Sequence, residues 1–571
     1  MIESKHYDFD AIVVGSGISG GWAAKELTEK GLKVLLLERG RDLQHGSGYL
    51  GEHAPNWKLP YHGKKPRQLY EEEYPMANRV YAFGEATRQF WMNEKENPYV
   101  VDDKEPFMWI RGNTVGGRSL IWGRQTYRWS EMDFRANEKD GHGIPWPVGY
   151  DDIAPWYSHV EKFIGVNGRP EGLPQLPDSE FQKHMPWMAL EKTIEARLKK
   201  KAPDVTLTNA RVAILTEDLP GRAACHYCGP CHRGCSTGSY FSSQASTLPA
   251  AKATGNMTLK PDALVERLEH DPETGKISAV HVLDTQTRER TRFTSRIVFL
   301  CASTVASTQI LMNSKSEAYP NGLANRSGVL GHYMMDHTLG ISSMGIFLDN
   351  MDTYYFGNRP TGLYVPRFRN LDGQDEDADF VRGYGYQTAT LRMDWATGFN
   401  VKGFGADLKE SLRKPGPWIF ALAGFTECLP QKSNRMYLSN KVDQYGMPQV
   451  AFEMRWSDNE VKLRRDAAKQ GRRLQRAAGA VFTIETETEV TREQMSLPGE
   501  GIHEMGTARM GDDPAQSVLN KWNQAHDIDN LFITDGSFMT SAACVNPSLT
   551  YMAFTARACD YAVKQIGEGL I

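Results

Sequence analysis

Cysteine is scarce in this sequence. Its 571 residues contain eight cysteines, too few for a disulfide framework to hold a chain of this length together. Long apolar runs are also missing: no stretch approaches the roughly 18 consecutive apolar residues that would cross a bilayer, so we expect no transmembrane segment. The first ten residues, MIESKHYDFD, are polar and lead directly into a predicted strand, which leaves no room for a secretory signal.

An excess of charge of one sign is absent as well. The formal net charge is −4, so the chain has no broad positive field to attract a polyanion, and we expect no nucleic-acid partner. The basic stretch 462–479 is predicted to be one helix with a solvated charged face. With 40% hydrophobic and 24% charged residues the composition is that of an ordinary globular protein, and the length favours two packed domains.

The first motif lies in residues 8–40. A short apolar run, a glycine-rich turn, an amphipathic helix and a second apolar run predict strand, helix, strand. Gly15, Gly17 and Gly20 form GxGxxG, which permits a tight turn, close approach of a pyrophosphate, and close packing of helix on strand. Glu38, at the end of the second strand, is placed to accept hydrogen bonds from a ribose diol. The motif predicts a dinucleotide site but does not distinguish FAD from NAD.

Four later segments narrow this choice. They are the second glycine-rich loop at Gly116 and Gly117, HEMGTARMG at 503–511, ITDGS at 533–537, and VNPSLTYMA at 545–553. Together with the N-terminal motif, and in this order, they resemble the glucose-methanol-choline (GMC) family of FAD oxidoreductases from end to end. The resemblance implies that the dinucleotide is FAD.

The resemblance also implies a fold. In this α/β architecture, a Rossmann-like FAD-binding domain of discontinuous segments carries an inserted α+β substrate domain built on an antiparallel sheet. We expect the FAD-binding domain to comprise residues 1–45, 105–130, 237–325 and 496–571. We expect the substrate domain to comprise residues 46–104, 131–220 and 326–495, with a separate cysteine loop at 221–236.

Two stretches of alternating apolar and polar residues support this fold independently. Residues 256–303 contain short alternating runs broken by turn signals, which predicts a β-meander that returns to a buried strand. Residues 434–456 predict a second strand pair joined by a turn, which we expect to lie in the inserted sheet.

By resemblance, further residues would contact the cofactor. The backbone of Val265 would meet the adenine, although a core valine is an equally weighted interpretation, and Asp535 would point toward the ribityl or pyrophosphate region. The second loop reads GGRS where the family commonly has GGSS, which leaves open whether Arg118 faces the cofactor phosphates, the substrate or solvent. The expected FAD-binding set is Gly15, Ser16, Gly17, Gly20, Glu38, Gly116, Gly117, Ser119, Val265, Asp535 and Thr550.

Oxidation of an alcohol by a flavin needs a base for the hydroxyl proton. A neutral histidine suits this task because its ordinary pKa lies near the working pH. The resemblance places His503 at the position of the base and Asn546 at that of its partner, whose amide would hold the hydroxyl oxygen in line. His337 and His526 lie outside the matched motifs, and we expect them to be structural.

Half of the cysteines lie within the eleven residues CHYCGPCHRGC. Cys225, Cys228, Cys231 and Cys235 have the spacing C-x2-C-x2-C-x3-C, which is typical of iron–sulfur ligation. A zinc site, disulfides and free thiols are the weaker alternatives, since such close ligands strain a tetrahedron around one ion and short disulfide loops stabilise little. The spacing leaves a three-iron (3Fe-4S) or four-iron (4Fe-4S) cluster open.

Within the family, the cysteine cluster resembles that of bacterial FAD-dependent sugar dehydrogenases, above all glucoside 3-dehydrogenases. This resemblance implies oxidation of a secondary hydroxyl of a sugar, at C3 of a glucoside or other pyranoside, to a ketone, with hydride transfer to flavin N5. Electrons would pass through the cluster to a cytochrome c or a quinone. The alternatives are an oxidase that uses oxygen and a noncatalytic electron-transfer flavoprotein subunit.

Two further expectations follow from this resemblance. Enzymes of this type pair with a small partner subunit that carries an export signal, which implies a periplasmic or membrane-associated location, with a cytoplasmic location as the alternative. A sugar ring could stack on Trp91, Trp109 or Trp129, although a buried tryptophan more often belongs to the core.

Overall fold

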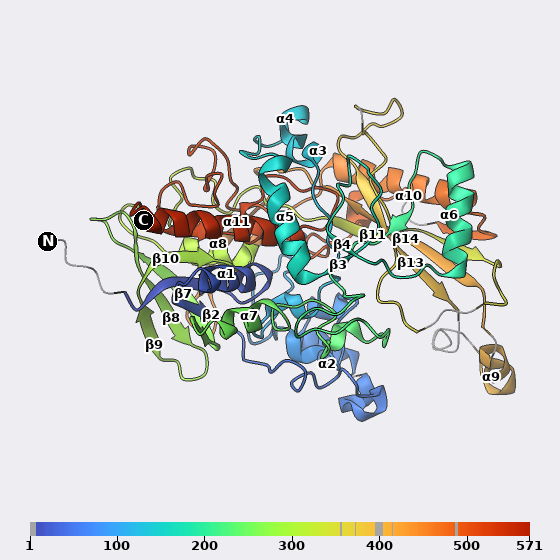
Figure 1. Ribbon diagram of the computed structural model, residues 1–571, viewed down its shortest axis with the longest axis horizontal. Coiled ribbons are helices and arrows are strands. Elements are labelled where there is room, and N and C mark those ends of the chain that lie inside the picture. Colours follow the sequence, from blue (N-terminus) through green and yellow to red (C-terminus); the bar gives the residue numbers. More distant parts are fainter. Residues whose placement is uncertain are drawn as a thin grey trace.

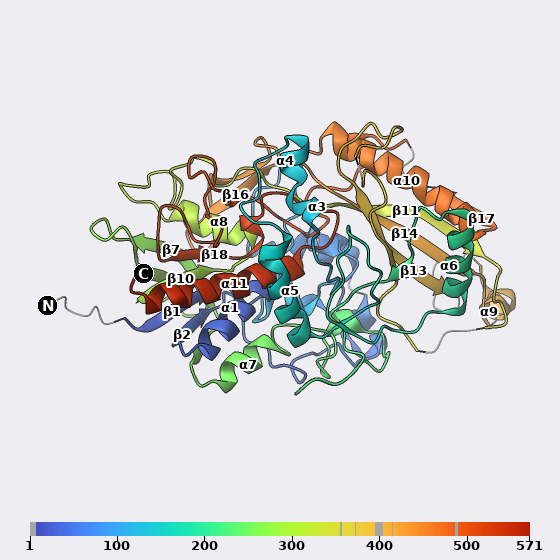
Figure 2. The ribbon, with the colours of Figure 1, turned by 45° about the horizontal axis from the view of Figure 1, so that its top comes forward.

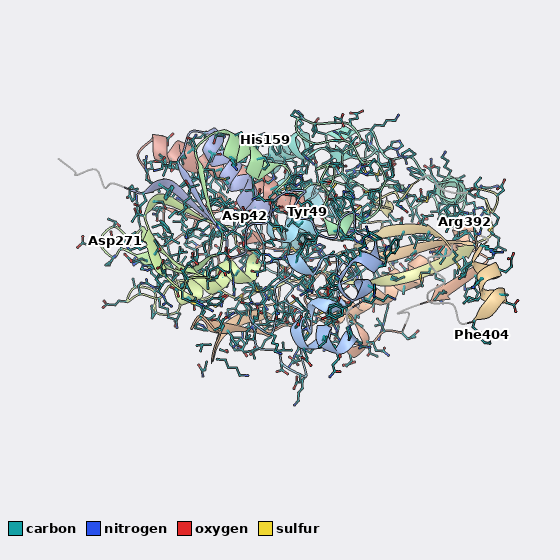
Figure 3. All side chains as sticks on the ribbon, turned by 90° about the horizontal axis from the view of Figure 1, so that it is seen from below. Asp42, Tyr49, His159, Asp271, Arg392 and Phe404 are labelled. Carbon is teal, nitrogen blue, oxygen red and sulfur yellow. The ribbon has the colours of Figure 1, made fainter. Side chains whose placement is uncertain are left out.

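The computed structural model describes residues 7–64, 66–353, 357–371, 373–393, 403–413, 415–485 and 489–571. Residues 1–6, which are part of the segment used in the export-signal argument, lie outside the described residues. The molecule is elongated, with one large sheet toward each end (Figure 1). Asp271, in the turn between two strands of the meander, and Phe404, just before helix α9, lie toward opposite ends of the molecule (Figure 3).

A five-stranded parallel sheet forms the centre of the half that contains the C-terminus (Figure 1). Its order is β18-β10-β1-β2-β6. The strands are β1 (Phe9–Val14), β2 (Val34–Leu37), β6 (Met257–Lys260), β10 (Ser295–Leu300) and β18 (Leu531–Ile533). The inner strands β1, β2 and β10 are apolar runs because both faces of a parallel sheet are covered.

Helices and a β-meander cover the two faces of this sheet. Ala11 and Val13 share a core with α1, α7 and α11, whereas Ile12 and Val14 share a core with the meander and α8, as the alternation of side chains along a strand requires. The covering elements are α1 (Ile18–Glu29), α7 (Thr247–Ala253), α8 (Thr304–Asn313), α11 (Ser548–Gly567) and the meander β7 (Ala263–His270), β8 (Ile277–Asp284) and β9 (Arg290–Phe293). The β-meander predicted for residues 256–303, with its return to buried β10, is confirmed.

A six-stranded antiparallel sheet lies toward the other end, in the order β17-β11-β14-β13-β12-β5. Its strands are β5 (Thr208–Asn209), β11 (Thr338–Phe347), β12 (Leu363–Val365), β13 (Tyr384–Arg392), β14 (Trp418–Thr426) and β17 (Phe482–Glu485). Helices α6 (Ala189–Lys201) and α10 (Asp458–Ala478) pack on one face, against side chains such as Trp418 and Phe420 (Figure 2). The two sheets confirm the predicted combination of a parallel and an antiparallel sheet.

The other face of the antiparallel sheet is mostly apolar and accessible. Ile341, Ala423 and Gln387 form one row across β11, β14 and β13, because each is paired with the next in the strand register. Leu391 lies on the same face as Gln387 by the period of two, and Ile341 and Leu391 are 46% and 55% exposed. Gln387 therefore brings an amide to an otherwise apolar row.

Helix α10 confirms the single helix predicted for residues 462–479. It begins at a capping box, in which Ser457 accepts from the Asn459 N–H and Glu460 accepts from the Ser457 N–H. It ends at Gly479, whose φ of 90° fits the left-handed C-cap. Its charges are not all solvated, however: Asp466 is buried and accepts from Arg369 and Tyr384, because this side of the helix packs on the sheet.

The strand pair predicted for residues 434–456 exists, as β15 (Arg435–Val442) and β16 (Pro448–Glu453), but its expected place in the inserted sheet is wrong. The pair forms a separate two-stranded sheet. Phe452 stacks on Phe107 with ring centroids 4.2 Å apart, and the Val100 N–H donates to Val450 O at 2.9 Å. These contacts hold the pair against residues near 100, away from the antiparallel sheet.

Five further α-helices and two further strands are present in the described residues. They are α2 (Arg67–Glu73), α3 (Glu131–Phe134), α4 (Ala136–Asp140), α5 (Tyr150–Ile164), α9 (Gly405–Arg413), β3 (Val166–Asn167) and β4 (Phe181–Gln182). Within the described part of the chain, none of the helices combines the length and the apolar character needed to cross a membrane.

Candidate functional site

The N-terminal glycine turn joins β1 to α1, and its three glycines differ in their surroundings. Gly15 has a φ of +93°, which disfavours other residues. A Cβ on Gly20 would lie 1.7 Å from Gly15 O, so helix and strand could not pack as closely with any side chain there. A Cβ on Gly17, in contrast, would meet no atom within 4 Å. Gly17 therefore borders open space at the helix N-terminus.

The second glycine loop lies directly against the first. The Gly116 N–H donates to Ser16 Oγ at 2.8 Å, and a Cβ on Gly117 would approach Gly17 Cα to 3.6 Å. Ser119 Oγ donates to Gly116 O at 2.6 Å and so stabilises the turn from within. The structure thus brings together two loops separated by about a hundred residues of sequence.

Glu38 connects this pair of loops to the end of β2. Its Oε2 accepts from Ser16 N and Ser16 Oγ at 3.0 and 2.6 Å, and its Oε1 accepts from Gly40 N at 2.7 Å. Desolvation raises the pKa of Glu38 above its ordinary value, although these hydrogen bonds oppose the shift. Oε1, which accepts only one of these bonds, keeps acceptor capacity for a further donor such as a ribose hydroxyl.

These loops fit a dinucleotide. Helix α1 has no side-chain cap at Gly17, so its first N–H groups and the positive end of its dipole face the open space beside that glycine. Helix α11 also begins without a side-chain cap, directly after Asn546 and Pro547. The residues present therefore offer an anion site at α1 and a second positive helix end near His503.

Three other expected cofactor residues are buried. Val265 is 4% exposed and belongs to the main core, as its alternative interpretation requires. Both carboxylate oxygens of Asp535 accept hydrogen bonds from the protein, from Ser537 and Ser307. Thr550 Oγ1 lies 2.8 Å from the Tyr157 hydroxyl.

The three tryptophans considered for sugar stacking, Trp91, Trp109 and Trp129, are buried core residues, which leaves no ring face for a sugar.

His503 and Asn546 meet in space. Asn546 Nδ2 lies 3.3 Å from His503 Nε2, although 43 residues separate them in sequence. Asp336 holds the His503 loop: its Oδ1 accepts from the His503 N–H at 3.0 Å, and its Oδ2 accepts from the N–H groups of Gly499 and Gly501 at 2.9 and 3.0 Å. Asp336 was not predicted from the sequence as a site residue.

His337, which the sequence led us to expect to be structural, contacts the candidate base. Its Nδ1 lies 3.0 Å from His503 Nδ1, and the ring planes are nearly perpendicular, at 88°. Its Nε2 is hydrogen-bonded to the carbonyl of Ala543. His526 has different partners, with Nε2 bonded to Ser517 Oγ and Gly511 O.

Gln387 is a further residue that the sequence analysis missed. Its Nε2 donates to Asn546 Oδ1 at 2.6 Å. It comes from β13, so the antiparallel sheet supplies one side chain to the cluster around His503. No motif marks it; the register of β13 alone brings it here.

Desolvation keeps both histidines neutral. It lowers the pKa of His503 well below 6.5, and the positive charge of Arg118 acts in the same direction. The pKa of the buried His337 falls to about 4 for the same main reason. At neutral pH each ring therefore has one protonated nitrogen and one nitrogen that can accept a proton or hydrogen bond.

Arg118, whose orientation the sequence left open, is held by a carboxylate of the His503 loop. It pairs with Glu504, with Nη1 2.8 Å from Oε2 and 3.1 Å from Oε1. The Glu504 side chain is 1% exposed, so this carboxylate requires a charged partner.

The cysteine loop forms a separate cluster. Cys225, Cys231 and Cys235 are partly buried and Cys228 is exposed, and each sulfur is close enough to others to interact electrostatically. Burial raises the pKa of the Cys231 thiol to about 12. Across the parts of the chain that the structure describes, no three His, Cys, Asp or Glu side chains are arranged to hold a metal ion.

Two buried arginines lie beside this loop. Arg124 interacts electrostatically with Cys231, and Arg222 with Cys235. Arg222 donates to Gly238 O and Ile164 O, but its buried Nη2 has no hydrogen-bond partner in the structure. Four thiols next to two buried positive charges are a donor set that suits a negatively charged group, such as an iron–sulfur cluster bound by thiolates.

Comparison with known proteins agrees with this arrangement. A family model described as GMC oxidoreductase matches residues 9–339, and a second of the same description matches residues 430–555. A 2-methyl-1,2-propanediol dehydrogenase from Mycolicibacterium austroafricanum is 28% identical over 98% of this chain and 96% of its own length. The fructose dehydrogenase large subunit from Gluconobacter japonicus is 25% identical over 98% of both chains.

A solved structure shows the same fold. The formate oxidase of Aspergillus oryzae superimposes with a TM-score of 0.62 over 98% of this chain and 99% of its own, at 14% identity. The matched family models together cover most of the sequence, including both glycine loops and the loops of His503 and Asn546. The chain therefore belongs to the GMC oxidoreductase family.

Proposed function

We propose that this chain is an FAD-dependent dehydrogenase that oxidises a secondary hydroxyl of a sugar, at C3 of a glucoside or related pyranoside, to a ketone. The observation that carries the proposal is the pairing of His503 Nε2 with Asn546 Nδ2 at 3.3 Å. A neutral imidazole nitrogen beside an amide donor is what removal of a hydroxyl proton requires.

The two side chains have complementary tasks. Asn546 Nδ2 donates a hydrogen bond to the hydroxyl oxygen and orients it, while His503 Nε2 accepts the hydroxyl proton. The carbon also loses a hydride, so the C–O bond becomes C=O and the substrate is oxidised by two electrons. Bound FAD would supply the acceptor for that hydride.

Residues of both glycine loops would hold the FAD. Gly17 leaves space for the pyrophosphate at the uncapped start of α1, and Glu38 would bind the ribose. Ser16, Gly116 and Ser119 would keep the two loops together around it.

We further propose that Cys225, Cys228, Cys231 and Cys235 bind an iron–sulfur cluster. Their spacing and the neighbouring Arg124 and Arg222 support this assignment. Such a cluster would supply one-electron transfer toward a cytochrome c or a quinone.

A small partner subunit is part of the same proposal. One relative is named as the large subunit of a fructose dehydrogenase, so a homologous chain is part of a larger assembly. We propose that the partner carries the export signal and gives this chain a periplasmic or membrane-associated location. A cytoplasmic location is the alternative that fractionation of the native host would detect.

Anaerobic reduction of the flavin tests the proposed function. Methyl glucoside should bleach the oxidised flavin spectrum, and His503→Ala should keep its FAD but slow bleaching by about 10²- to 10⁴-fold. His142→Ala, at an exposed histidine, is the matched control and should bleach at the wild-type rate. No bleaching by any sugar or alcohol would favour a noncatalytic flavoprotein, and rapid peroxide formation in air without stimulation by a one-electron acceptor would favour an oxidase.

A further inference from the structure

We propose that His337 is a positioning residue that fixes His503 in the tautomer with its proton on Nδ1, so that Nε2 is free to accept the substrate proton. This inference rests on the proposed function in one respect, the role of His503 as base. The tautomer itself is a property of the chain and can be measured without substrate.

The carbonyl of Ala543 determines which nitrogen of His337 carries the proton. A carbonyl oxygen can only accept, so the hydrogen bond between Ala543 O and His337 Nε2 requires a proton on that nitrogen. His337 is completely buried and neutral, and a neutral ring carries one proton. His337 Nδ1 is therefore an acceptor.

The contact between the two histidines follows from this. His503 Nδ1 lies 3.0 Å from His337 Nδ1, and two acceptors at that distance would repel. Since His337 Nδ1 accepts, His503 Nδ1 must carry the proton and donate it. Because His503 is also neutral, its Nε2 has a free lone pair.

The other side of His503 gives an independent check. An acceptor at His503 Nε2 requires a donor opposite, and Asn546 presents its Nδ2 there at 3.3 Å. Asn546 Oδ1 must then accept, and it does so from Gln387 Nε2 at 2.6 Å. Along the series Gln387, Asn546, His503, His337, Ala543, each residue donates a hydrogen bond to the next one. The proton positions assigned from the Ala543 end and from the Gln387 end therefore agree.

The other groups around His503 do not provide a competing partner for Nδ1. Arg118 and Glu504 are paired with each other, and the carboxylate of Asp336 accepts backbone N–H groups, including that of His503. Phe425 contributes only a tilted ring with its centroid 5.9 Å from that of His503. In the described structure His337 is the hydrogen-bond partner of His503 Nδ1.

The first test is made on the wild-type holoprotein. Selective ¹⁵N labelling of histidine distinguishes protonated from unprotonated ring nitrogens, and loss of signals in His503→Ala and His337→Asn assigns the two rings. We expect His503 to be protonated at Nδ1 and His337 at Nε2. Protonation of His503 at Nε2 would overturn the proposal whatever the enzyme's substrate.

The second test separates the two hydrogen bonds of His337. Asparagine can place a carbonyl oxygen where Nδ1 lies, which keeps the acceptor for His503 and loses the bond to Ala543. Glutamine can place an amide N–H where Nε2 lies, which keeps the bond to Ala543 and loses the acceptor. The two variants have similar polarity and both remove the imidazole.

We expect His337→Gln to slow flavin reduction by at least about tenfold, with the His503 signals shifting toward Nε2 protonation, and His337→Asn to recover most of that loss. FAD content and thermal unfolding verify that both variants are folded. Equal losses in the two variants with an unchanged His503 tautomer would show that His337 is merely structural. Failure of the wild type to oxidise any alcohol would instead refute the proposed function and leave the tautomer result standing.

Discussion

Arg118 of the second glycine loop forms an ion pair with Glu504, the residue that follows His503, at 2.8 Å. The pair joins the proposed cofactor loop to the proposed base. Glu504 O in turn accepts from Thr304 Oγ1 at 2.6 Å, so the backbone of the base loop is also tied to α8. Desolvation, His337 and the positive charge of Arg118 together lower the pKa of the His503 imidazole.

The lowered pKa of His503 predicts an unusual pH dependence of flavin reduction. His503 can act as a base only when neutral, and its lowered pKa keeps it neutral in acid, so protonation of His503 should not slow flavin reduction as the pH falls through 6.5. Arg118→Met removes a repelling positive charge and leaves Glu504 unpaired. Both changes favour protonated His503, so the decline in rate should move to higher pH by about one unit or more. Stopped-flow reduction across a pH series measures the shift.

Arg118→Lys is the matched control for this prediction. Lysine keeps the positive charge near Glu504 but lacks the planar guanidinium group, so the pH profile should stay close to that of the wild type. Nearby Asp336 and His337 are unchanged in both variants. Identical profiles for the methionine variant and the wild type would contradict an electrostatic effect of Arg118 on the base.

Two glycines of the same motif should respond differently to alanine. Gly17→Ala places a methyl group in open space, so the chain should fold normally and lose FAD affinity. Gly20→Ala places a Cβ 1.7 Å from Gly15 O, so the backbone must move and stability should fall. FAD bound per chain and the thermal unfolding of the apoprotein distinguish the two effects. Normal FAD binding by Gly17→Ala would argue against a pyrophosphate beside this glycine.

Asp336→Asn should loosen the loop that carries His503. The carboxylate accepts three backbone N–H groups, and an amide would turn a donor toward at least one of them. Loss of one buried acceptor costs about 1–3 kcal/mol, so the unfolding temperature and the rate of flavin reduction should both fall. Asp512→Asn, on an exposed stretch, is the control and should change neither. An unaltered unfolding temperature would mean that the loop is held by other contacts.

Serine substitutions test the cysteine loop. If the loop binds a cluster, Cys231→Ser and Cys235→Ser should lower iron and acid-labile sulfide in anaerobically purified protein, while methyl glucoside still bleaches the flavin. Loss of cluster in only one of Cys225→Ser and Cys228→Ser would indicate three ligands, and loss in both would indicate four. Wild-type protein without iron or labile sulfide would refute the assignment.

Local constraints made much of the fold predictable from the sequence. The glycine turn, the strand that precedes it and helix α1 are specified within residues 8–40, because the positive φ of Gly15 and the close packing of Gly20 on Gly15 O are local steric constraints. The meander of residues 256–303 could also be predicted, since the alternation of apolar and polar residues and the turn residues recur within a few positions.

Relationships between distant segments were not predictable in this way. The strands β15 and β16 could be identified, but their separation from the antiparallel sheet depends on the stacking of Phe452 on Phe107. His337 and Gln387 could not be recognised as site residues because their partners lie 166 and 159 residues away in the sequence. Neither residue carries a local pattern that separates a site residue from an ordinary histidine before a strand or a glutamine within one.

One C-terminal segment contributes to both the candidate site and the core. Strand β18, Asn546 and helix α11 all belong to the last tenth of the chain, and the carbonyl that anchors the histidine pair, Ala543, lies among them. Loss of this segment would remove the amide that pairs with His503, the carbonyl that anchors His337, and a helix whose side chains are buried in the core. The orientation of the base and the integrity of the core therefore depend on the same stretch of chain.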